Sequence, residues 1–189
     1  DPGAQQLGLE IISHMRQRVD ELAEEYDLNY TLLATPAEGL SGRFVGIDRK
    51  MFGSIPGVTD RDYYTNSFHV PVHQEISCFD KINLEAPYHR LTNAGHISYV
   101  EFSAPPVDNP EAFERIIRQM AAADMGYAGI NFPIDECRVC GNQGIFPEEC
   151  PSCGSTEIRR VRRITGYLST VDRFNDAKRM ELANRKTHI

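Results

Sequence analysis

The chain has 189 residues and a formal net charge of −7, which is enough length for one compact domain with a small appendage. No apolar stretch approaches the roughly 20 residues that span a bilayer, and no signal peptide is visible, so we expect a soluble protein with no membrane partner. The chain begins with Asp1 rather than Met, which we interpret as a fragment or a processed form of a longer polypeptide.

The charge is unevenly distributed along the chain. From Glu157 onward there are nine Lys or Arg against four Asp or Glu, a local charge of +5, so residues 1–156 carry −12. An acidic body of this kind argues against a general nucleic-acid binder. Three interpretations of the basic segment stay open: it contacts a phosphate-bearing ligand, it contacts an acidic surface of its own protein, or it forms a solvated helix and strand edge.

The first half of the chain predicts helices and one strand. Apolar residues recur at three- and four-residue steps over 7–26, which predicts an amphipathic helix packed on another element. The short apolar run 29–34, bounded by turn-forming residues, predicts a buried strand. A second helix is expected to begin at Thr35. Residues 60–91 show no clean period and are expected to form a loop with one or two short helices.

The second half predicts strands that alternate with a helix. Residues 96–102 and 127–132 have the pattern of strands. Between them, Asn109 and Pro110 predict the cap and first turn of a helix that ends at about Asp124. Strands joined by helices indicate a parallel α/β sheet or part of an α/β barrel.

Two Cys-x-x-Cys pairs are the strongest signal in the chain. Their members are Cys137, Cys140, Cys150 and Cys153. Without a secretory signal, this spacing indicates metal binding rather than disulfides, and with it a reducing cytoplasm. A glycine after each pair, Gly141 and Gly154, lets the backbone turn toward the sulfurs. Four thiolates suit a structural Zn²⁺ site with no open position, with an iron–sulfur centre or a redox-active pair as the alternative.

The segment after the cysteines combines several short motifs. Residues 162–168 read Arg-Arg-Ile-Thr-Gly-Tyr-Leu, in which Gly166 alone would be an ordinary bulge or strand–turn glycine. The sequence Arg-Phe-Asn-x-x-Lys-x-x-Glu-x-x-x-Arg-x-x-His follows over 173–188. Thr-Asn-Ser-Phe-His-Val-Pro at 65–71 and Asn-Phe-Pro at 131–133 precede the cysteines. Together these segments resemble the anaerobic (class III) ribonucleoside-triphosphate reductases.

The resemblance implies an α/β fold that is the C-terminal part of a ten-stranded α/β barrel of the glycyl radical enzyme type. The implied division is a barrel portion over 1–134, a zinc ribbon over 135–160, and the glycyl radical loop with a C-terminal helix over 161–189. The implied radical position is Gly166. A planar α-carbon radical conjugates with the amide groups on both sides, and glycine has no Cβ to crowd that geometry.

The resemblance also implies an activity and its partners. The expected reaction is anaerobic reduction of ribonucleoside triphosphates to deoxyribonucleoside triphosphates, a step of DNA precursor synthesis, by glycyl and thiyl radical chemistry. The fragment is expected to be inactive alone. An iron–sulfur activase that uses S-adenosylmethionine would generate the radical, and formate or a redoxin-type protein would be the reductant. A cytoplasmic homodimer is expected, with no nucleic acid as partner.

Cys78 is the one cysteine outside the paired motifs. In the family, the glycyl radical takes hydrogen from a cysteine on a separate loop, and the thiyl radical attacks the ribose 3′ carbon. Family order places that loop upstream of this fragment. We therefore interpret Cys78 as a buried thiol in a half-buried helix, with a catalytic thiol as the alternative.

A possible phosphate site lies near Thr35. Thr35 and Glu38 have the spacing of a capping box, with Pro36 in the first helical position, which needs no ligand. The alternative is that the first-turn amides hold substrate phosphates, as the resemblance to a helix start in ribonucleotide reductases implies. The candidate substrate contacts are Thr35, Ala37, Glu38, Gly39, Asn66 and His69.

Two other functions stay open. Acyl-lyases and decarboxylases of the glycyl radical type share an Arg-Val-x-Gly-Tyr segment, although the cysteine pairs ahead of it favour the reductase. A zinc-ribbon module whose basic tail binds nucleic acid is the second alternative. The acidic body and the lack of interleaved surface aromatics argue against it.

Overall fold

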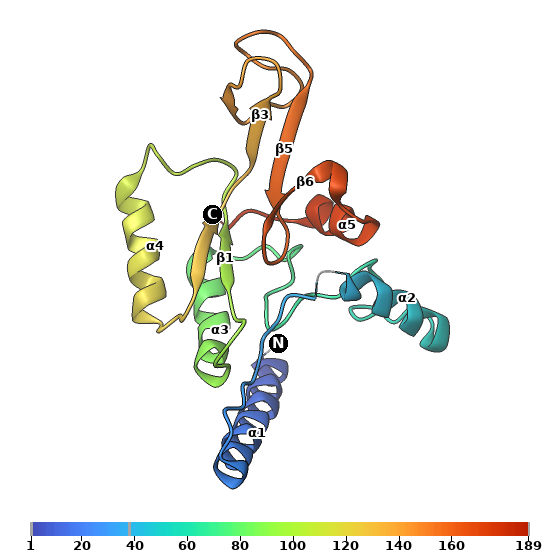
Figure 1. Ribbon diagram of the computed structural model, residues 1–189, viewed down its shortest axis with the longest axis vertical. Helices are drawn as coiled ribbons and strands as arrows, with labels where there is room; N and C mark the ends of the chain where they lie inside the picture. The colour runs from blue at the N-terminus through green and yellow to red at the C-terminus, as the bar shows by residue number, and fades with distance from the viewer. Residues whose placement is uncertain (1, 38, 189) are drawn as a thin grey trace.

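The computed structural model describes residues 2–37 and 39–188 of the chain. Figure 1 shows an elongated molecule with a small α/β unit in the middle, a projecting sheet at one end and the first helix at the other. In chain order the elements are α1 (Pro2–Tyr26), α2 (Leu40–Phe52), α3 (Cys78–Leu91), β1 (Ser98–Glu101), α4 (Pro110–Ala122), β2 (Ala128–Asn131), β3 (Ile134–Cys137), β4 (Gln143–Gly144), β5 (Ile158–Arg163), β6 (Leu168–Thr170), the 3-10 helix η1 (Val171–Arg173) and α5 (Asp176–Asn184).

The α/β unit is built on two parallel strands. β1 pairs with β2 along their whole length, and α4 forms the connection between them. Helices α3 and α4 pack on this pair through a buried apolar cluster. The cluster consists of Cys78, Ile82, Val100, Ile116 and Met120. Parallel strands joined by a helix confirm the predicted α/β class.

A second sheet is antiparallel and has the strand order β4–β3–β5–β6. β3 runs away from the α/β unit (Figure 1), and Cys137 at its far end pairs with Ile158 at the start of β5. β5 returns toward the α/β unit, and residues 164–167 form the bend between β5 and β6. We call this segment the glycine bend because it contains Gly166. The predicted boundaries after 134 and 160 lie within β3 and β5, so the domain division stays a prediction.

Several elements form where the sequence predicts them. α1 contains the predicted helix 7–26, and the strands predicted over 96–102 and 127–132 correspond to the shorter β1 and β2. The cap of α4 is also confirmed, because the Asn109 side chain accepts a hydrogen bond from the N–H of Ala112 at 3.0 Å. Pro110 occupies the first turn, where its missing N–H costs no intrahelical bond.

The predicted strand over 29–34 and the predicted helix start at Thr35 are wrong. Residues 29–34 form a single parallel bridge, from Leu33 to Ala94, because their partner is a loop rather than a strand. α2 begins at Leu40, and its cap is Gly39 without a side-chain hydrogen bond. The segment ahead of α2 is instead held from outside the helix, since the Ala37 N–H donates to the Asn66 side chain at 2.5 Å.

Residues 78–91 form one long helix, α3, where a loop with short helices was predicted. The pattern was misleading because α3 buries polar side chains together with apolar ones, including Lys81, Glu85 and His89. Pro87 also lies inside this helix. A helix that is buried on several faces loses the apolar period that identifies an amphipathic helix.

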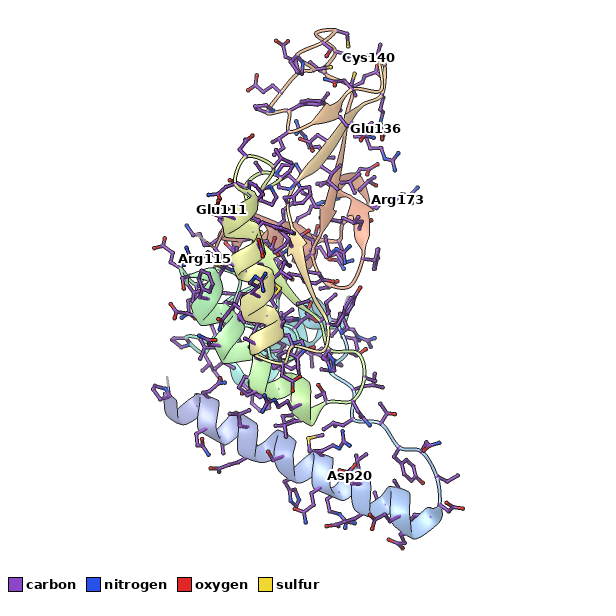
Figure 2. All side chains as sticks on the ribbon, turned by 90° about the vertical axis from the view of Figure 1, so that its left-hand side faces the viewer. Asp20, Glu111, Arg115, Glu136, Cys140 and Arg173 are labelled. Carbon is purple, nitrogen blue, oxygen red and sulfur yellow. The ribbon has the colours of Figure 1, made fainter. Side chains whose placement is uncertain are left out.

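Helices α1 and α2 present apolar side chains that the described residues leave uncovered. Leu7 and Ile11 of α1 are 57% and 51% exposed, and Phe44 of α2 is 48% exposed. α1 contacts the rest of the fold at α3, where Gln5 donates to the carbonyl of Leu84 at 2.8 Å. Figure 2 shows α1, with Asp20, at the end of the molecule opposite Cys140. Over residues 2–37 and 39–188, every helix is too short or too polar to cross a membrane.

Candidate metal centre and glycine bend

Two tight turns hold the four cysteines. In the first turn, the N–H of Gly141 donates to the carbonyl of Cys137 at 2.9 Å, and in the second, Gly154 donates to Cys150 at 2.8 Å. Both glycines have a positive φ, 74° and 71°, which would strain any residue with a side chain. The backbone turns predicted after each Cys-x-x-Cys pair are therefore confirmed.

The four sulfur atoms converge on one point. The Sγ atoms of Cys137 and Cys153 are 3.6 Å apart, as are those of Cys140 and Cys150, and all four lie within 4.8 Å of one another. A tetrahedral ion with metal–sulfur bonds of about 2.3 Å needs sulfurs about 3.8 Å apart. The set fits one metal ion whose four ligands all come from the chain.

Asp135 connects the metal centre to β5. Its carboxylate is completely buried, and it accepts a hydrogen bond from the N–H of Phe146 at 2.9 Å. Phe146 packs against the buried cysteines. The same carboxylate is 3.2 Å from Arg160 and 2.7 Å from Arg162. These two positive charges offset the cost of removing the carboxylate from water. This role could not be predicted from the sequence, because a single Asp before a Cys pair has no distinctive pattern.

Arg185, just after α5, supports the start of the glycine bend. Its guanidinium donates to the carbonyls of Arg163 at 2.9 Å and Ile164 at 2.7 Å. It also pairs with Glu101 of β1 at 2.7 Å and with Glu181 of α5 at 2.9 Å. Together with the pairs made by Asp135, these contacts favour the interpretation that the basic segment binds acidic groups of its own protein.

Lys178 supports the other side of the bend. Its ammonium group lies 4.7 Å from the ring centre of Tyr167 and 5.8 Å from that of Phe174. It also donates to the Tyr167 hydroxyl at 3.3 Å. Tyr167 directly follows Gly166, so a side chain from α5 contacts the neighbour of the candidate radical position. Cation–π contacts of this kind contribute about 0.5–2 kcal/mol.

Two of the candidate substrate segments lie in direct contact. Asn66 is buried and binds the N–H of Ala37, while the Ser67 hydroxyl donates to the carbonyl of Thr35 at 3.1 Å. The Nδ2 atom of Asn66 is buried without a hydrogen-bond partner in the described structure. Gly39 caps α2, and Glu38 lies outside the described residues. No sequence pattern indicates that these two segments, about thirty residues apart, lie in contact.

His69 contacts a buried ion pair. Glu85 accepts from the ammonium of Lys81 at 2.5 Å and from the N–H of Val70 at 2.8 Å, and the Nδ1 of His69 lies 3.5 Å from the same oxygen. Burial would raise the pKa of Glu85, but the His69 hydrogen bond and the Lys81 charge outweigh it and lower the pKa to about 2. His69 is thus held by α3, and the i,i+4 spacing of Lys81 and Glu85 was the overlooked sequence signal.

One cavity connects the substrate segments to the glycine bend. The lining of this cavity includes Pro36 and Asn66 from the candidate substrate segments and Ile164 and Thr165 from the glycine bend. Arg185 from the C-terminal segment also lines it. It therefore adjoins the residues directly before Gly166. The Nε atom of Arg185 is buried without a hydrogen-bond partner in the described structure.

Cys78 lies apart from this cavity. It begins α3, is 6% exposed and belongs to the apolar cluster beneath β1. Burial raises the pKa of its thiol, which disfavours the reactive thiolate. These observations support the interpretation of Cys78 as a buried core thiol rather than a catalytic one.

The fold and the site define an α/β protein with a four-cysteine metal module and a glycine bend that is contacted by Lys178 of α5 and by Arg185 just after it. A model of the anaerobic ribonucleoside-triphosphate reductase family matches residues 1–188. The anaerobic ribonucleoside-triphosphate reductases of Escherichia coli K12 and Enterobacteria phage T4 are 40% and 38% identical to the chain, each over 96% of it. The chain belongs to the anaerobic ribonucleoside-triphosphate reductase family.

The chain corresponds to only part of these relatives. It spans 27% of the length of the E. coli protein and 31% of the phage protein. Among solved structures, an anaerobic ribonucleotide reductase matches 94% of the chain with a TM-score of 0.79 at 21% identity, and the chain covers 28% of it. The Thermotoga maritima enzyme in complex with dATP and CTP matches 90% with a TM-score of 0.72 at 22% identity, with 27% of it covered. These two structures support the fold.

Proposed function

We propose that this chain carries the radical glycine of an enzyme that reduces ribonucleoside triphosphates to deoxyribonucleoside triphosphates under anaerobic conditions. Membership of the family supports the reaction. The observation that carries the assignment of Gly166 is the glycine bend, whose first residues line a cavity shared with Pro36 and Asn66. The radical would thus be stored next to the segment that we assign to the substrate.

Gly166 stores the unpaired electron in this proposal. An S-adenosylmethionine-dependent iron–sulfur activase removes one α-hydrogen, and the remaining carbon radical is conjugated with the amides on both sides. A cysteine outside this chain then gives its hydrogen to the glycyl radical and becomes the thiyl radical that attacks the ribose. The barrel of ten strands, of which β1 and β2 would be two, encloses this chemistry.

The metal that the family resemblance and the four thiolates favour is Zn²⁺. Cys137, Cys140, Cys150 and Cys153 would hold it. The ion supplies folding free energy to a module with few apolar residues, because thiolate ligation replaces a hydrophobic core. Through its ion pairs with Arg160 and Arg162, Asp135 links the metal module to β5, the strand that leads into the glycine bend.

Thr35, Ala37, Glu38 and Gly39 are proposed to bind the substrate phosphates, with Asn66 fixing their backbone. The contact between Asn66 and Ala37 supports this role because it holds the segment ahead of α2 in a defined conformation. His69, held by Glu85, would border the same cavity. The N-terminus of α2 adds a favourable partial charge for phosphate.

The remaining partners are proposed on the family resemblance alone. Formate or a redoxin-type protein would be the reductant, and the enzyme would be a cytoplasmic homodimer. The reading as a nucleic-acid-binding ribbon is less favoured, because Arg160, Arg162 and Arg185 are all engaged by the protein's own carboxylates.

Turnover of the full-length enzyme tests the proposal. After anaerobic activation, the wild-type enzyme is expected to convert ribonucleoside triphosphates to deoxyribonucleoside triphosphates, and Gly166→Ala is expected to abolish this. Gly46→Ala is the matched control, because a Cβ at that α2 position meets nothing within 4 Å. Deoxynucleotide formation by Gly166→Ala at the wild-type rate would refute the assignment.

A further inference from the structure

Arg185 makes an unusual set of contacts for a residue so far from the glycine bend in sequence. Its guanidinium reaches two successive backbone carbonyls, those of Arg163 and Ile164, just before the bend. Backbone carbonyls at the end of a strand normally pair with another strand or with water. Here the arginine side chain takes that place, and it does so with two charge-assisted hydrogen bonds.

The guanidinium is itself rigidly held. Glu101 of β1 and Glu181 of α5 accept from it at 2.7 Å and 2.9 Å, and the Arg185 side chain is only 10% exposed. Glu101 also accepts from the Asn131 amide at 2.8 Å, and the same amide donates to the carbonyl of Arg163 at 3.1 Å. The Arg185 guanidinium therefore connects β1, α5 and the start of the bend, and the Asn131 amide adds β2 to this network.

The residues after Arg185 fix it to β1. The N–H of Lys186 donates to the carbonyl of Val72 at 2.8 Å, and the N–H of His188 donates to the carbonyl of Glu101 at 2.9 Å. In return, the N–H of Glu101 donates to the Nδ1 of His188 at 2.9 Å. Lys186 and His188 thus attach the segment after Arg185 to the loop at Val72 and to Glu101 at the end of β1.

We propose that Arg185 is a positioning residue that holds the glycine bend in the conformation used for turnover. The proposal rests on the proposed function, since it assigns a role in the radical reaction. The guanidinium fixes the carbonyls two and three residues before Gly166, so it sets where the glycine lies relative to the cavity beside Asn66.

Two substitutions separate this role from a general structural one. Arg185→Gln removes the positive charge and replaces the two guanidinium NH2 groups with one amide NH2 group. Arg185→Lys keeps a positive charge between Glu101 and Glu181, but a single ammonium group cannot reproduce the planar two-armed geometry. Arg179→Gln, in α5, is the matched control, because Arg179 is 53% exposed and pairs only with Asp176 among the described residues.

The experiment uses the full-length reductase and its activase. Before activation, hydrogen–deuterium exchange of residues 164–167 is expected to be about tenfold faster or more in both Arg185 variants than in Arg179→Gln, because two hydrogen bonds that hold the bend are lost. After activation, the glycyl radical signal by electron paramagnetic resonance is expected to be retained. Turnover per radical is expected to fall by about tenfold or more, since loss of a positioning contact reduces productive geometry.

The outcomes distinguish this proposal from the assignment of the radical. If the wild-type enzyme forms no radical, the proposed function fails, while the exchange comparison still tests whether Arg185 holds the bend. Unchanged exchange, or unchanged turnover per radical in the Arg185 variants, would overturn the positioning role. So would global unfolding of both variants with loss of zinc, because Arg185 would then be a general stability residue.

Discussion

Asp135 and Arg162 form a buried ion pair with 2.7 Å between Oδ1 and Nη1, at the junction between the cysteine module and the rest of the protein. Asp135 also accepts from the backbone of Phe146, which packs against the metal-site cysteines. One carboxylate therefore links the wall of the metal centre to the strand that ends in the glycine bend. Motion of the module and of the bend is expected to be coupled through it.

Asp135→Asn is expected to lower the free energy of unfolding by about 3 kcal/mol, because two half-buried arginines lose their carboxylate partner and the Phe146 N–H loses a charged acceptor. The adjacent substitution Glu136→Gln is the control. Glu136 pairs with Arg159 at 3.2 Å, but both side chains are substantially exposed, so a loss of about 0–1 kcal/mol is expected. Denaturant unfolding of the zinc-loaded protein measures both. Equal losses would contradict the role assigned to Asp135.

Removal of one thiolate is expected to abolish metal binding. Cys150→Ser should reduce the zinc content of the purified protein from about one ion per chain to near zero, because a structural tetrahedral site needs all four ligands. Cys78→Ser, which alters a buried thiol outside the site, should keep its zinc. Elemental analysis after gel filtration measures the metal. Full zinc retention by Cys150→Ser would exclude this cysteine as a ligand.

Asn66→Ala is expected to raise the KM for the ribonucleotide by about tenfold, because the Ala37 N–H loses a buried acceptor and the proposed phosphate segment loses its conformation. Ser67→Ala removes a more exposed hydrogen bond to the same segment and should have a smaller effect. Steady-state kinetics of the activated full-length enzyme separate KM from kcat. A larger effect of Ser67→Ala would argue against this arrangement.

Stability is expected to fall between about pH 6.5 and pH 4 in part through His188. Burial lowers the pKa of His188 to about 4, and its Nδ1 accepts the Glu101 N–H, so the folded protein keeps the imidazole neutral. The unfolded chain binds more protons in this range, so the free energy of unfolding rises with pH until about 6.5. His188→Asn should flatten this slope. Urea unfolding across this pH range provides the measurement, and an unaltered slope in His188→Asn would count against the buried neutral state.

The sequence predicted those features that depend on local chemistry. The cap of α4 needs only Asn109 and the following proline, and the cysteine turns need only the glycine after each pair. Both are short-range constraints that residue type and spacing determine. The α/β class followed from the order of such elements.

The features that the sequence did not predict depend on distant partners. Thr35 fitted a capping box, but contacts from Asn66 and Ser67 engage that segment and α2 begins later. The extent of α3 was not predicted because burial on several faces removes the apolar period. The contacts of Arg185 with β1 and the glycine bend join residues 84 and 21 positions apart, which no local pattern encodes. The resemblance identified Arg185 as part of a motif without giving its contacts.

The most direct test of the central claim is the fate of the backbone at Gly166 when the radical meets oxygen. The full-length protein is activated anaerobically by its activase, exposed to air and analysed by mass spectrometry, with Gly166→Ala and Gly46→Ala as controls. Our account predicts cleavage at Gly166 in the wild-type protein and in Gly46→Ala, and an intact chain in Gly166→Ala. An intact wild-type chain, with an activase that demonstrably activates another glycyl radical protein, would contradict the assignment of Gly166.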